Sequence, residues 1–305
     1  MQPKISVIIP NFNHSEFLEQ RISSVINQTY QNIEIILLDD ASSDTSRTIL
    51  ESYKSHPKVA HVVYNEHNSG SPFKQWQKGI ELATGNYVWI AESDDYCELN
   101  FLELLVPKTE TSGLVYSQSY DVNEKGEIIG DRLDYTKPFE SNLWEKDFDI
   151  EGTQLIEQYM IYKNVIPNAS AVLFKRNLID ADIFSEDLVE MRMCGDWLFW
   201  TMISAKTKVS FINQHLNYFR KHEKVSRTHD SKAKKVKRCL EEKTIRLHIA
   251  DHYSIINKGA DKLLYQRWFK THRSTSIFNS SFYDVCLPYT TPFSLLRKFL
   301  SYKLT

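Results

Sequence analysis

Residues 5–13 read ISVIIPNFN, and this stretch decides the class of fold. Its first five residues form an apolar, β-branched run, which is typical of a strand buried on both faces of a parallel sheet. The run ends at Pro10. Residues 15–28 then place apolar side chains at helical spacing, and IEIILLDD at 33–40 is a second apolar run. The sequence therefore predicts a strand, a helix and a second strand in succession.

The same alternation continues downstream. VAHVVYNE at 59–66 predicts a third strand, a helix is expected over about 71–83, and YVWIA at 87–91 predicts a fourth strand. Strands separated by helices favour a parallel sheet with right-handed crossovers, so we expect an α/β fold. Further strands are predicted at 114–123, 169–176, 208–213 and 216–220.

Three polar loops follow the predicted strands at their carboxyl ends. They comprise residues 10–13, 39–44 and 92–95. In open α/β sheets, ligands bind in the crevice outside the carboxyl ends of the strands. We therefore expect these three loops to share one binding site.

Composition excludes several classes of protein. The chain of 305 residues is 42% hydrophobic and has a formal net charge of -2, so no overall positive field would attract nucleic acid. Its four cysteines are far apart and form no Cys-X-X-Cys pair, which argues against a zinc knuckle or a disulfide scaffold. The apolar run near the N-terminus is too short for a signal peptide or a membrane span. We expect a cytoplasmic protein with no nucleic-acid partner.

An acidic cluster follows the fourth predicted strand directly. Glu92, Asp94 and Asp95 lie there within four residues. Carboxylates at such a strand end can bind a ribose hydroxyl and a divalent cation that bridges phosphates. The same pattern is also typical of a solvated turn that caps the next helix. The cluster alone does not distinguish these two interpretations.

Three motifs occur together and in order: SVIIPNFN at 6–13, IILLDDASSDTS at 35–46 and TGNYVWIAESDDY at 84–96. With them, residues 4–227 resemble the family-2 glycosyltransferases of the GT-A fold. The resemblance implies a Rossmann-like α/β domain with a mainly parallel central sheet flanked by helices. It also implies inverting transfer of a sugar, by default from a UDP-linked donor, with Mn²⁺ or Mg²⁺ as cofactor. The expected acceptor is a glycan or lipid-linked hydroxyl in surface polysaccharide or glycolipid synthesis.

The resemblance assigns the nucleotide to the first two loops. It implies that the backbone of Pro10 and the side chain of Phe12 line the base. It further implies that Asp40 accepts an N–H of the base. Lys74, in the segment NSGSPFKQWQKGI, is a candidate for contact with the diphosphate.

The third loop corresponds to the family's Asp-X-Asp element. Glu92 takes the first place, Ser93 the middle place and Asp94 the metal-binding last place. Glutamate in the first place departs from the family pattern, because it keeps the charge on a longer arm. Asp95 is a secondary candidate, and it otherwise begins the next helix.

The segment CGDWLFW at 194–200 resembles the part of the family that carries the general base. Asp196 would take the proton of the acceptor hydroxyl as this attacks the anomeric carbon opposite the departing diphosphate. The alternative is an N-cap aspartate on a buried aromatic helix. Asn168 and Trp197 are expected along the acceptor channel.

The segment NYFRKHEKVSR at 217–227 supplies candidate cations and a metal ligand. His222 matches a histidine that completes the metal shell in some members of the family. Arg220 or Lys221 is expected to neutralise the diphosphate leaving group. Residues 224–227 are expected to form a lid over the donor.

The chain divides by pattern into two parts. Residues 1–227 are expected to form the catalytic domain, with a nucleotide-binding half at 1–100 and an acceptor-binding half at 101–227. Residues 228–305 are expected to form a basic, mainly helical extension. Its tail, FSLLRKFLSYK, either packs on the domain or lies in a membrane interface on the cytoplasmic side. The oligomeric state stays open, with a homodimer as one alternative.

Two other functions compete with this interpretation. A nucleotidyltransferase that makes sugar nucleotides also uses acidic metal ligands, but it normally has a Gly-rich phosphate loop where this chain has PNFNHSEF at 10–17. A catalytically degenerate binding module of the GT-A fold is the second alternative, and the departure at Glu92 permits it.

Overall fold

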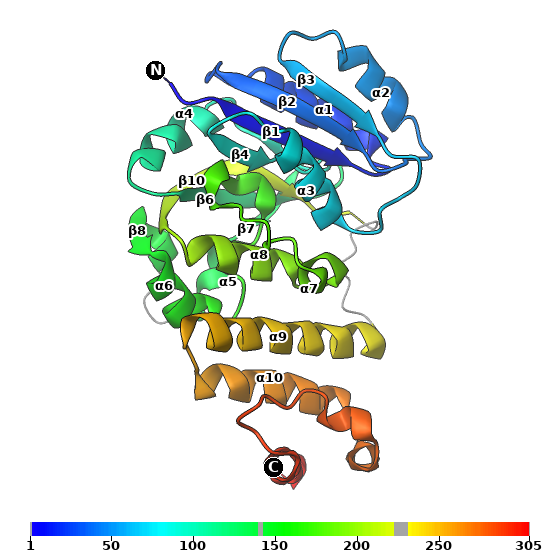
Figure 1. Ribbon diagram of the computed structural model, residues 1–305, viewed down its shortest axis with the longest axis vertical. Helices are drawn as coiled ribbons and strands as arrows, with labels where there is room; N and C mark the ends of the chain where they lie inside the picture. The colour runs from blue at the N-terminus through cyan, green and yellow to red at the C-terminus, as the bar shows by residue number, and fades with distance from the viewer. Residues whose placement is uncertain (1, 140–142, 223–230, 305) are drawn as a thin grey trace.

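The computed structural model describes residues 2–139, 143–222 and 231–304. Its strands form one mixed sheet in the order β3-β2-β1-β4-β9-β6-β10-β5, with β7 added beside β6 and β8 beside β10 (Figure 1). The strands are β1 (Ile5–Asn11), β2 (Ile33–Asp39), β3 (Val59–Tyr64), β4 (Tyr87–Ile90), β5 (Tyr96–Cys97), β6 (Leu114–Val122), β7 (Ile128–Asp131), β8 (Phe148–Glu151), β9 (Val172–Lys175) and β10 (Lys208–Arg220).

Helices cover the sheet and continue beyond it. The α-helices are α1 (Ser15–Ile26), α2 (Ser46–Tyr53), α3 (Pro72–Leu82), α4 (Phe101–Leu105), α5 (Leu133–Thr136), α6 (Gly152–Leu155), α7 (Glu186–Glu190), α8 (Gly195–Ser204), α9 (Lys232–Tyr253), α10 (Lys258–Thr271) and α11 (Pro292–Leu304). The short 3-10 or π segments are η1 (Val106–Glu110), η2 (Leu143–Glu145), η3 (Ile156–Met160), η4 (Ala169–Ala171), η5 (Arg176–Leu178), η6 (Ser274–Phe278) and η7 (Ser280–Tyr283).

The four N-terminal strands of the sheet run parallel, as predicted. β1 pairs with β2 and with β4, and β2 pairs with β3, each time in parallel. In the first pairing, Asn11 at the end of β1 lies opposite Asp39 at the end of β2. Every residue of β1, β2 and β4 is buried, which explains why their sequences are continuous apolar runs. The carboxyl ends of these strands therefore meet at one edge of the sheet.

Alternate side chains of the strands enter two different cores. On β1, Val7 and Ile9 pack with α1, α2 and α4, whereas Ile8 packs with α3 and α8 on the opposite face. This division follows from the period of two in a strand. The core that contains Val7 and Ile9 also includes Leu18 of α1, and the core that contains Ile8 includes Trp76 of α3. The result is a three-layer α/β arrangement (Figure 1).

The other half of the sheet is mixed. β9 lies antiparallel to both β4 and β6, while β6 and β10 are parallel. Two separate strands were predicted at 208–213 and 216–220, and this prediction is wrong, because β10 runs unbroken from Lys208 to Arg220. Its register against β6 shifts between Ile212 and Asn217. The polar interruption in the sequence is thus an irregularity within one strand.

The C-terminal helices stack away from the sheet, with α9 nearest to it and α11 farthest (Figure 1). Ile245 and Ile249 of α9 belong to the same core as Trp197 of α8. A third core joins α10 and α11, with Trp268 and Phe299 among its members. The predicted boundary at 227 and the predicted lid at 224–227 lie outside the described residues. In the ranges that the structure describes, no helix combines the length and apolarity needed to span a bilayer.

Candidate functional site

The three polar loops lie together at the carboxyl edge of the sheet. Asn11 donates its side-chain N–H to the carboxylate of Asp39 at 3.1 Å and to Ser42 Oγ at 3.1 Å, which joins the first loop to the second. Asn13 and Ala41 both have positive φ, at 57° and 62°. This left-handed conformation turns each loop sharply as it leaves its strand.

A carboxylate and two imidazoles meet beside the third loop. His222, just after β10, places Nε2 3.1 Å from Oδ2 of Asp94. His14, just before α1, places Nδ1 2.9 Å from Oγ of Ser93. One ligand atom from each of His14, Asp94 and His222 lies within 4.8 Å of the others. Within the described ranges, no other group of three or more metal-ligating side chains comes this close.

These three side chains suit a divalent cation that accepts nitrogen ligands. Nδ1 of His222 is buried and has no hydrogen-bond partner among the described residues. Burial opposes the charge of Asp94, but the hydrogen bond from His222 and the positive potential of His14 outweigh burial and lower its pKa. Mg²⁺ prefers oxygen ligands, whereas first-row transition ions accept imidazole as well. The mixed set therefore fits Mn²⁺ better than Mg²⁺.

Glu92 forms a side-chain hydrogen bond with α3. Its Oε1 accepts the indole N–H of Trp76, on α3, at 2.8 Å. Its backbone N–H donates to Ser170 Oγ at 3.1 Å, and its backbone carbonyl accepts from Nε of Arg21 at 2.9 Å. Glutamate has one methylene more than aspartate, and in this structure the longer side chain reaches the indole. Ser93, the middle residue of the motif, is buried and bonds to His14.

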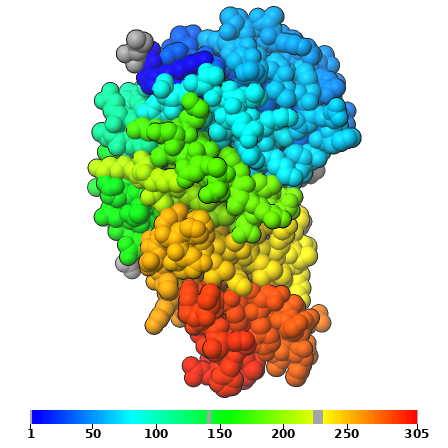
Figure 2. Space-filling model, viewed as in Figure 1, coloured from blue at the N-terminus to red at the C-terminus, as the bar shows by residue number. Residues whose placement is uncertain are grey.

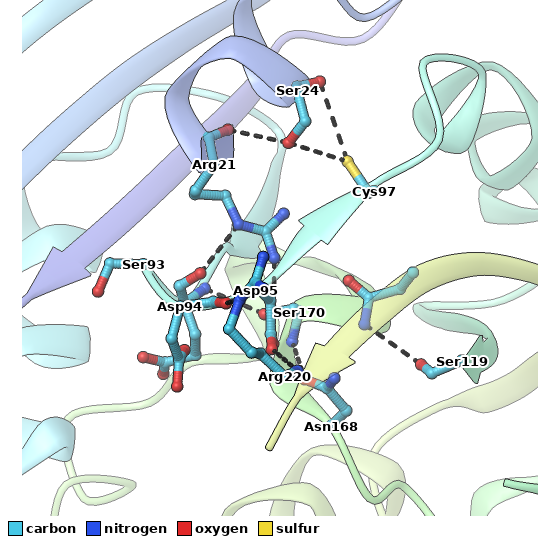
Figure 3. Close-up of polar contacts among 12 residues, drawn as sticks. Arg21, Ser24, Ser93, Asp94, Asp95, Cys97, Ser119, Asn168, Ser170 and Arg220 are labelled. Atoms are coloured by element: carbon cyan, nitrogen blue, oxygen red, sulfur yellow. Dashed lines mark hydrogen bonds and ion pairs between the residues drawn. The ribbon is translucent and has the colours of Figure 1, made fainter. Parts of the chain in front are cut away.

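Two buried arginines hold the acidic loop from either side (Figure 3). Arg21 comes from α1, and its Nη2 lies 4.0 Å from Oδ2 of Asp95. Asp95 also accepts the backbone N–H of Arg220 at 2.9 Å. Burial, followed by the negative charge of Asp94, raises the pKa of Asp95 to about 6. Asp95 therefore fixes the loop to β10.

Arg220 was expected at the diphosphate, but the structure gives it other partners. Its Nε donates to the backbone carbonyl of Asp94 at 2.8 Å, and its Nη2 donates to Gln20 Oε1 at 2.6 Å. Its Nη1 donates to the carbonyls of Asn123 and Glu124. The side chain is only 2% exposed. These partners give Arg220 a supporting position behind the Asp94 backbone, and its expected contact with the diphosphate stays a prediction.

The candidates for the nucleotide base differ in exposure. Phe12 is 44% exposed at the sheet edge, whereas Pro10 is buried within β1. Asp40 is buried, and its carboxylate accepts hydrogen bonds from Asn65 at 2.6 Å, from Gln75 at 2.9 Å and from the backbone and hydroxyl of Ser69. A base N–H could donate to Asp40 only in addition to these hydrogen bonds from Asn65, Ser69 and Gln75.

Lys74 lies on the first turn of α3. Its side chain is exposed, and Nζ is 3.4 Å from the backbone carbonyl of Ser69. This weak contact leaves the ammonium group at the surface, where it can reach an anion.

Asp196 lies in the first turn of α8, half-buried. Its Oδ1 accepts the backbone N–H of Trp197, and its Oδ2 accepts the side-chain N–H of Asn164 at 3.2 Å. Gly195 brings α8 close to α3, because a Cβ atom there would lie 2.3 Å from the ring of Phe73. The start of α8 therefore packs directly on the helix whose Trp76 binds Glu92.

Comparison with known proteins decides the family. The model of "Glycosyl transferase family 2" matches residues 6–164, which is just over half of the chain. The chain belongs to glycosyl transferase family 2. Two curated relatives are the glycosyltransferase GlyG of Streptococcus pneumoniae, 33% identical over 41% of this chain, and the putative teichuronic acid biosynthesis glycosyltransferase TuaG of Bacillus subtilis, 38% identical over 33%. The matches span about two fifths of each relative's length, 42% and 40%.

Solved structures share the GT-A fold of this family-2 chain. Residues 1–349 of Staphylococcus aureus TarS, solved in complex with UDP-GlcNAc, align with a TM-score of 0.62 and 20% identity over 91% of this chain and 76% of that one. The mannosyltransferase PcManGT of Pyrobaculum calidifontis, solved with GDP-Man and Mn²⁺, aligns with a TM-score of 0.52 and 14% identity over all of this chain and 81% of that one. These likenesses show the fold.

The two residues expected along the acceptor channel of this family-2 fold are buried. Trp197 donates its indole N–H to the Met160 carbonyl at 2.8 Å, inside the core shared with α9. Asn168 accepts the backbone N–H of Ser170 at 2.8 Å and caps η4. Their burial favours packing and loop support over the acceptor contact that we expected.

Two side chains that shape the site, His14 and Glu241, were not predicted from the sequence. His14 was not a candidate, because nothing in its own segment links it to Asp94. Glu241, on α9, accepts three backbone N–H groups from Arg192, Met193 and Cys194 at 2.8–2.9 Å. It thereby fixes the segment that leads into Asp196. An acidic residue on a charged helix is typical of a solvated face, so the sequence carried no signal for this contact.

Proposed function

We propose that the chain is an inverting glycosyltransferase that moves a sugar from a nucleoside diphosphate sugar to a hydroxyl of a surface glycan or lipid-linked acceptor. The observation that carries this proposal is the meeting of His14, Asp94 and His222 at the carboxyl end of β4. A divalent ion held there would lie at the strand ends where α/β sheets bind nucleotides. A UDP-linked donor is the first choice, because the aligned TarS structure contains UDP-GlcNAc.

In this proposal, each candidate has one task. His14, Asp94 and His222 would hold the cation, which would supply positive charge beside the diphosphate leaving group. Phe12 packs against the base at the sheet edge. Asp196 accepts the proton of the acceptor hydroxyl while its oxygen forms a bond to the anomeric carbon. The bond from that carbon to the diphosphate oxygen breaks, its electron pair leaves with the diphosphate, and the configuration inverts.

The last helix supports a further part of the proposal, which is contact with an anionic membrane surface where a lipid-linked acceptor would lie. Phe293, Leu300 and Leu304 share one stripe of α11 at helical spacing and are 77%, 45% and 88% exposed. Arg297 and Lys303 flank the stripe. Apolar and cationic residues arranged in this way are typical of helices that lie in a bilayer interface. Sedimentation with anionic vesicles tests this part, and Phe293→Ser should reduce the bound fraction.

Calorimetric titration tests the donor site. UDP, GDP and dTDP are titrated separately with Mn²⁺, with Mg²⁺ and with chelator, into the unaltered protein and into Asp94→Asn. We expect one diphosphate to bind with Mn²⁺, to bind more weakly with Mg²⁺, and to lose about tenfold or more in affinity in the variant. Metal-independent binding that Asp94→Asn leaves unchanged would contradict the proposed metal site.

Measurement of turnover distinguishes sugar transfer from binding of the donor without transfer. With the diphosphate sugar identified by calorimetry, release of nucleoside diphosphate is measured for the unaltered protein and for Asp196→Asn. The variant should bind donor normally and lose about 100-fold or more in rate, the usual contribution of a general base. Donor binding without turnover in either protein would favour the degenerate binding module instead.

A further inference from the structure

A second concave site lies in the C-terminal extension, between α10 and α11. The cleft has a volume of about 900 Å³, and Tyr289 and Thr290, from the segment before α11, line it together with the two helices. It belongs to the narrow, orange-to-red end of the molecule, beyond α9 (Figure 2). Pockets that bind small ligands or short oligomers have volumes of this order. The family-2 site does not include this cleft, because no residue of the sheet lines it.

The charge of the cleft is strongly one-sided. Lys258, Lys262, Arg297 and Lys298 line it, and Asp261 is the one carboxylate among its lining residues. Asp261 already accepts a hydrogen bond from the Tyr289 hydroxyl at 3.0 Å. None of the four cations has a carboxylate oxygen of a described residue within 4.0 Å.

Four cations around the single carboxylate of Asp261 focus a positive potential in this concave surface. Isolated surface lysines are ordinary, but three lysines and an arginine around one cleft with a single carboxylate are a binding feature for anions.

Aromatic rings alternate with these cations. Tyr289 is 46% exposed at the edge of the cleft, and Tyr302 is half-buried in its wall. Nζ of Lys298 lies 5.0 Å from the ring centroid of Tyr265. Aromatic side chains offer flat apolar surface together with a polar group. A ligand that matched this lining would have negative groups and also flat, weakly polar faces, as a chain of charged sugar rings has.

We propose that this cleft binds an acidic glycan, a saccharide chain that carries carboxylate or phosphate groups. Lys258, Lys262, Arg297 and Lys298 pair with its negative groups, and Tyr289 stacks on a sugar ring. If the proposed glycosyl transfer is correct, the cleft holds a distant part of an acidic polymeric acceptor while its end reaches Asp196.

Direct binding to the full chain tests the cleft without any donor. The probes are an oligogalacturonate, a maltooligosaccharide of equal length, and linear polyphosphate. We expect the oligogalacturonate to bind, the neutral oligosaccharide not to bind, and polyphosphate to bind more weakly because it has no rings to stack. Equal affinity for polyphosphate and oligogalacturonate would overturn the glycan assignment.

Charge reversal on the same two helices supplies the variant and its control. Lys262→Glu with Arg297→Glu reverses two cations of the cleft, and the affinity for oligogalacturonate should fall about tenfold or more. Lys270→Glu with Lys303→Glu makes the same change in net charge on α10 and α11 at exposed positions outside the cleft, and should leave the affinity unchanged. A loss of the same size in the control pair would mean general attraction to a basic surface and would overturn the site. Tyr289→Ala should weaken binding several-fold, and no change would overturn the stacking contact.

Two additional measurements distinguish glycan binding in the cleft from the proposed sugar transfer and from membrane binding. Mn²⁺-dependent binding of the nucleoside diphosphate should be unaltered in both charge-reversed pairs. If oligogalacturonate binds and no diphosphate does, the cleft stands and the proposed transfer fails. If oligogalacturonate keeps its affinity in Lys262→Glu with Arg297→Glu, the glycan assignment is overturned, and a loss of vesicle binding in the same variant would then assign these cations to the lipid surface alone.

Discussion

At the scale of single residues, His14 is the side chain whose removal should be most informative. His14→Ala leaves Asp94 and His222 in place but removes one nitrogen from the three-residue cluster. We expect the affinity for Mn²⁺ to fall about tenfold or more, measured by calorimetry or by electron paramagnetic resonance of the free ion. His67→Ala, at an exposed position, is the matched control. An unchanged affinity in His14→Ala would exclude this histidine from the metal site.

Glu34, at the start of β2, forms hydrogen bonds with Ser6 and Thr84 and should make stability depend on pH. Burial opposes its charge, but hydrogen bonds from Lys4, Ser6 and Thr84 outweigh burial and lower the pKa of Glu34 to about 2. A lowered pKa stabilises the fold above the ordinary value of 4.5, and this contribution is lost as pH falls towards about 2.

Glu34→Gln should therefore reduce the free energy of unfolding by about 1–3 kcal/mol at neutral pH. The difference from the unaltered protein should shrink between pH 4.5 and about 2, as followed by urea unfolding. The exposed Glu66→Gln is the control. A difference that stays constant across this range would contradict the assigned ionisation.

At the scale of elements, the segment before α8 depends on a helix from the extension. In Glu241→Gln, an amide group would replace one of the two oxygens that accept the N–H groups of Arg192, Met193 and Cys194. We expect the free energy of unfolding to fall by about 1–3 kcal/mol. The rate kcat should fall while KM for the donor stays the same, because Asp196 would lose its fixed position. The exposed Glu190→Gln is the control, and an unchanged kcat in Glu241→Gln would contradict the positioning role.

The elements that could be predicted from sequence are those with a strong local pattern. β1, β2 and β4 are buried on both faces, so each is a continuous apolar run. The same pattern wrongly predicted two strands in place of β10, because polar residues inside one strand resemble a loop between two strands.

Residues at the site were harder to predict than strands. The loops at the carboxyl ends of β1, β2 and β4 were predicted together, since strand order in a parallel sheet determines where they meet. The proximity of His14 to Asp94 could not be predicted, because it depends on side-chain directions that residue spacing does not determine. Arg220 was placed at the ligand because arginine is usually exposed or bound to an anion, whereas here backbone carbonyls bind it in the interior.

At the scale of the whole molecule, the extension and the sheet should unfold together. Ile245 and Ile249 of α9 lie in one core with Trp197, so α9 cannot separate without exposing that core. Ile245→Ala should reduce the free energy of unfolding by about 2–5 kcal/mol and shift one calorimetric transition as a whole. Ile256→Ala is the matched control, because Ile256 is 57% exposed. Two transitions, with only the smaller one shifted, would contradict a shared core.

If the cleft holds the acceptor as proposed, the shared core also sets the length of acceptor that can reach both the cleft and Asp196. Because α9 is packed into the sheet domain, the span from Asp196 to the cleft between α10 and α11 is set by rigid helices rather than by a tether. Acidic acceptors shorter than this span could bind only at Asp196 or only in the cleft, whereas longer acceptors could bind at both places. The dependence of kcat/KM on acceptor length should therefore show a step at one length, and Lys262→Glu with Arg297→Glu should flatten that step while leaving the shortest acceptors unaffected. A smooth rise that the variant does not change would mean that the protein does not measure its acceptor.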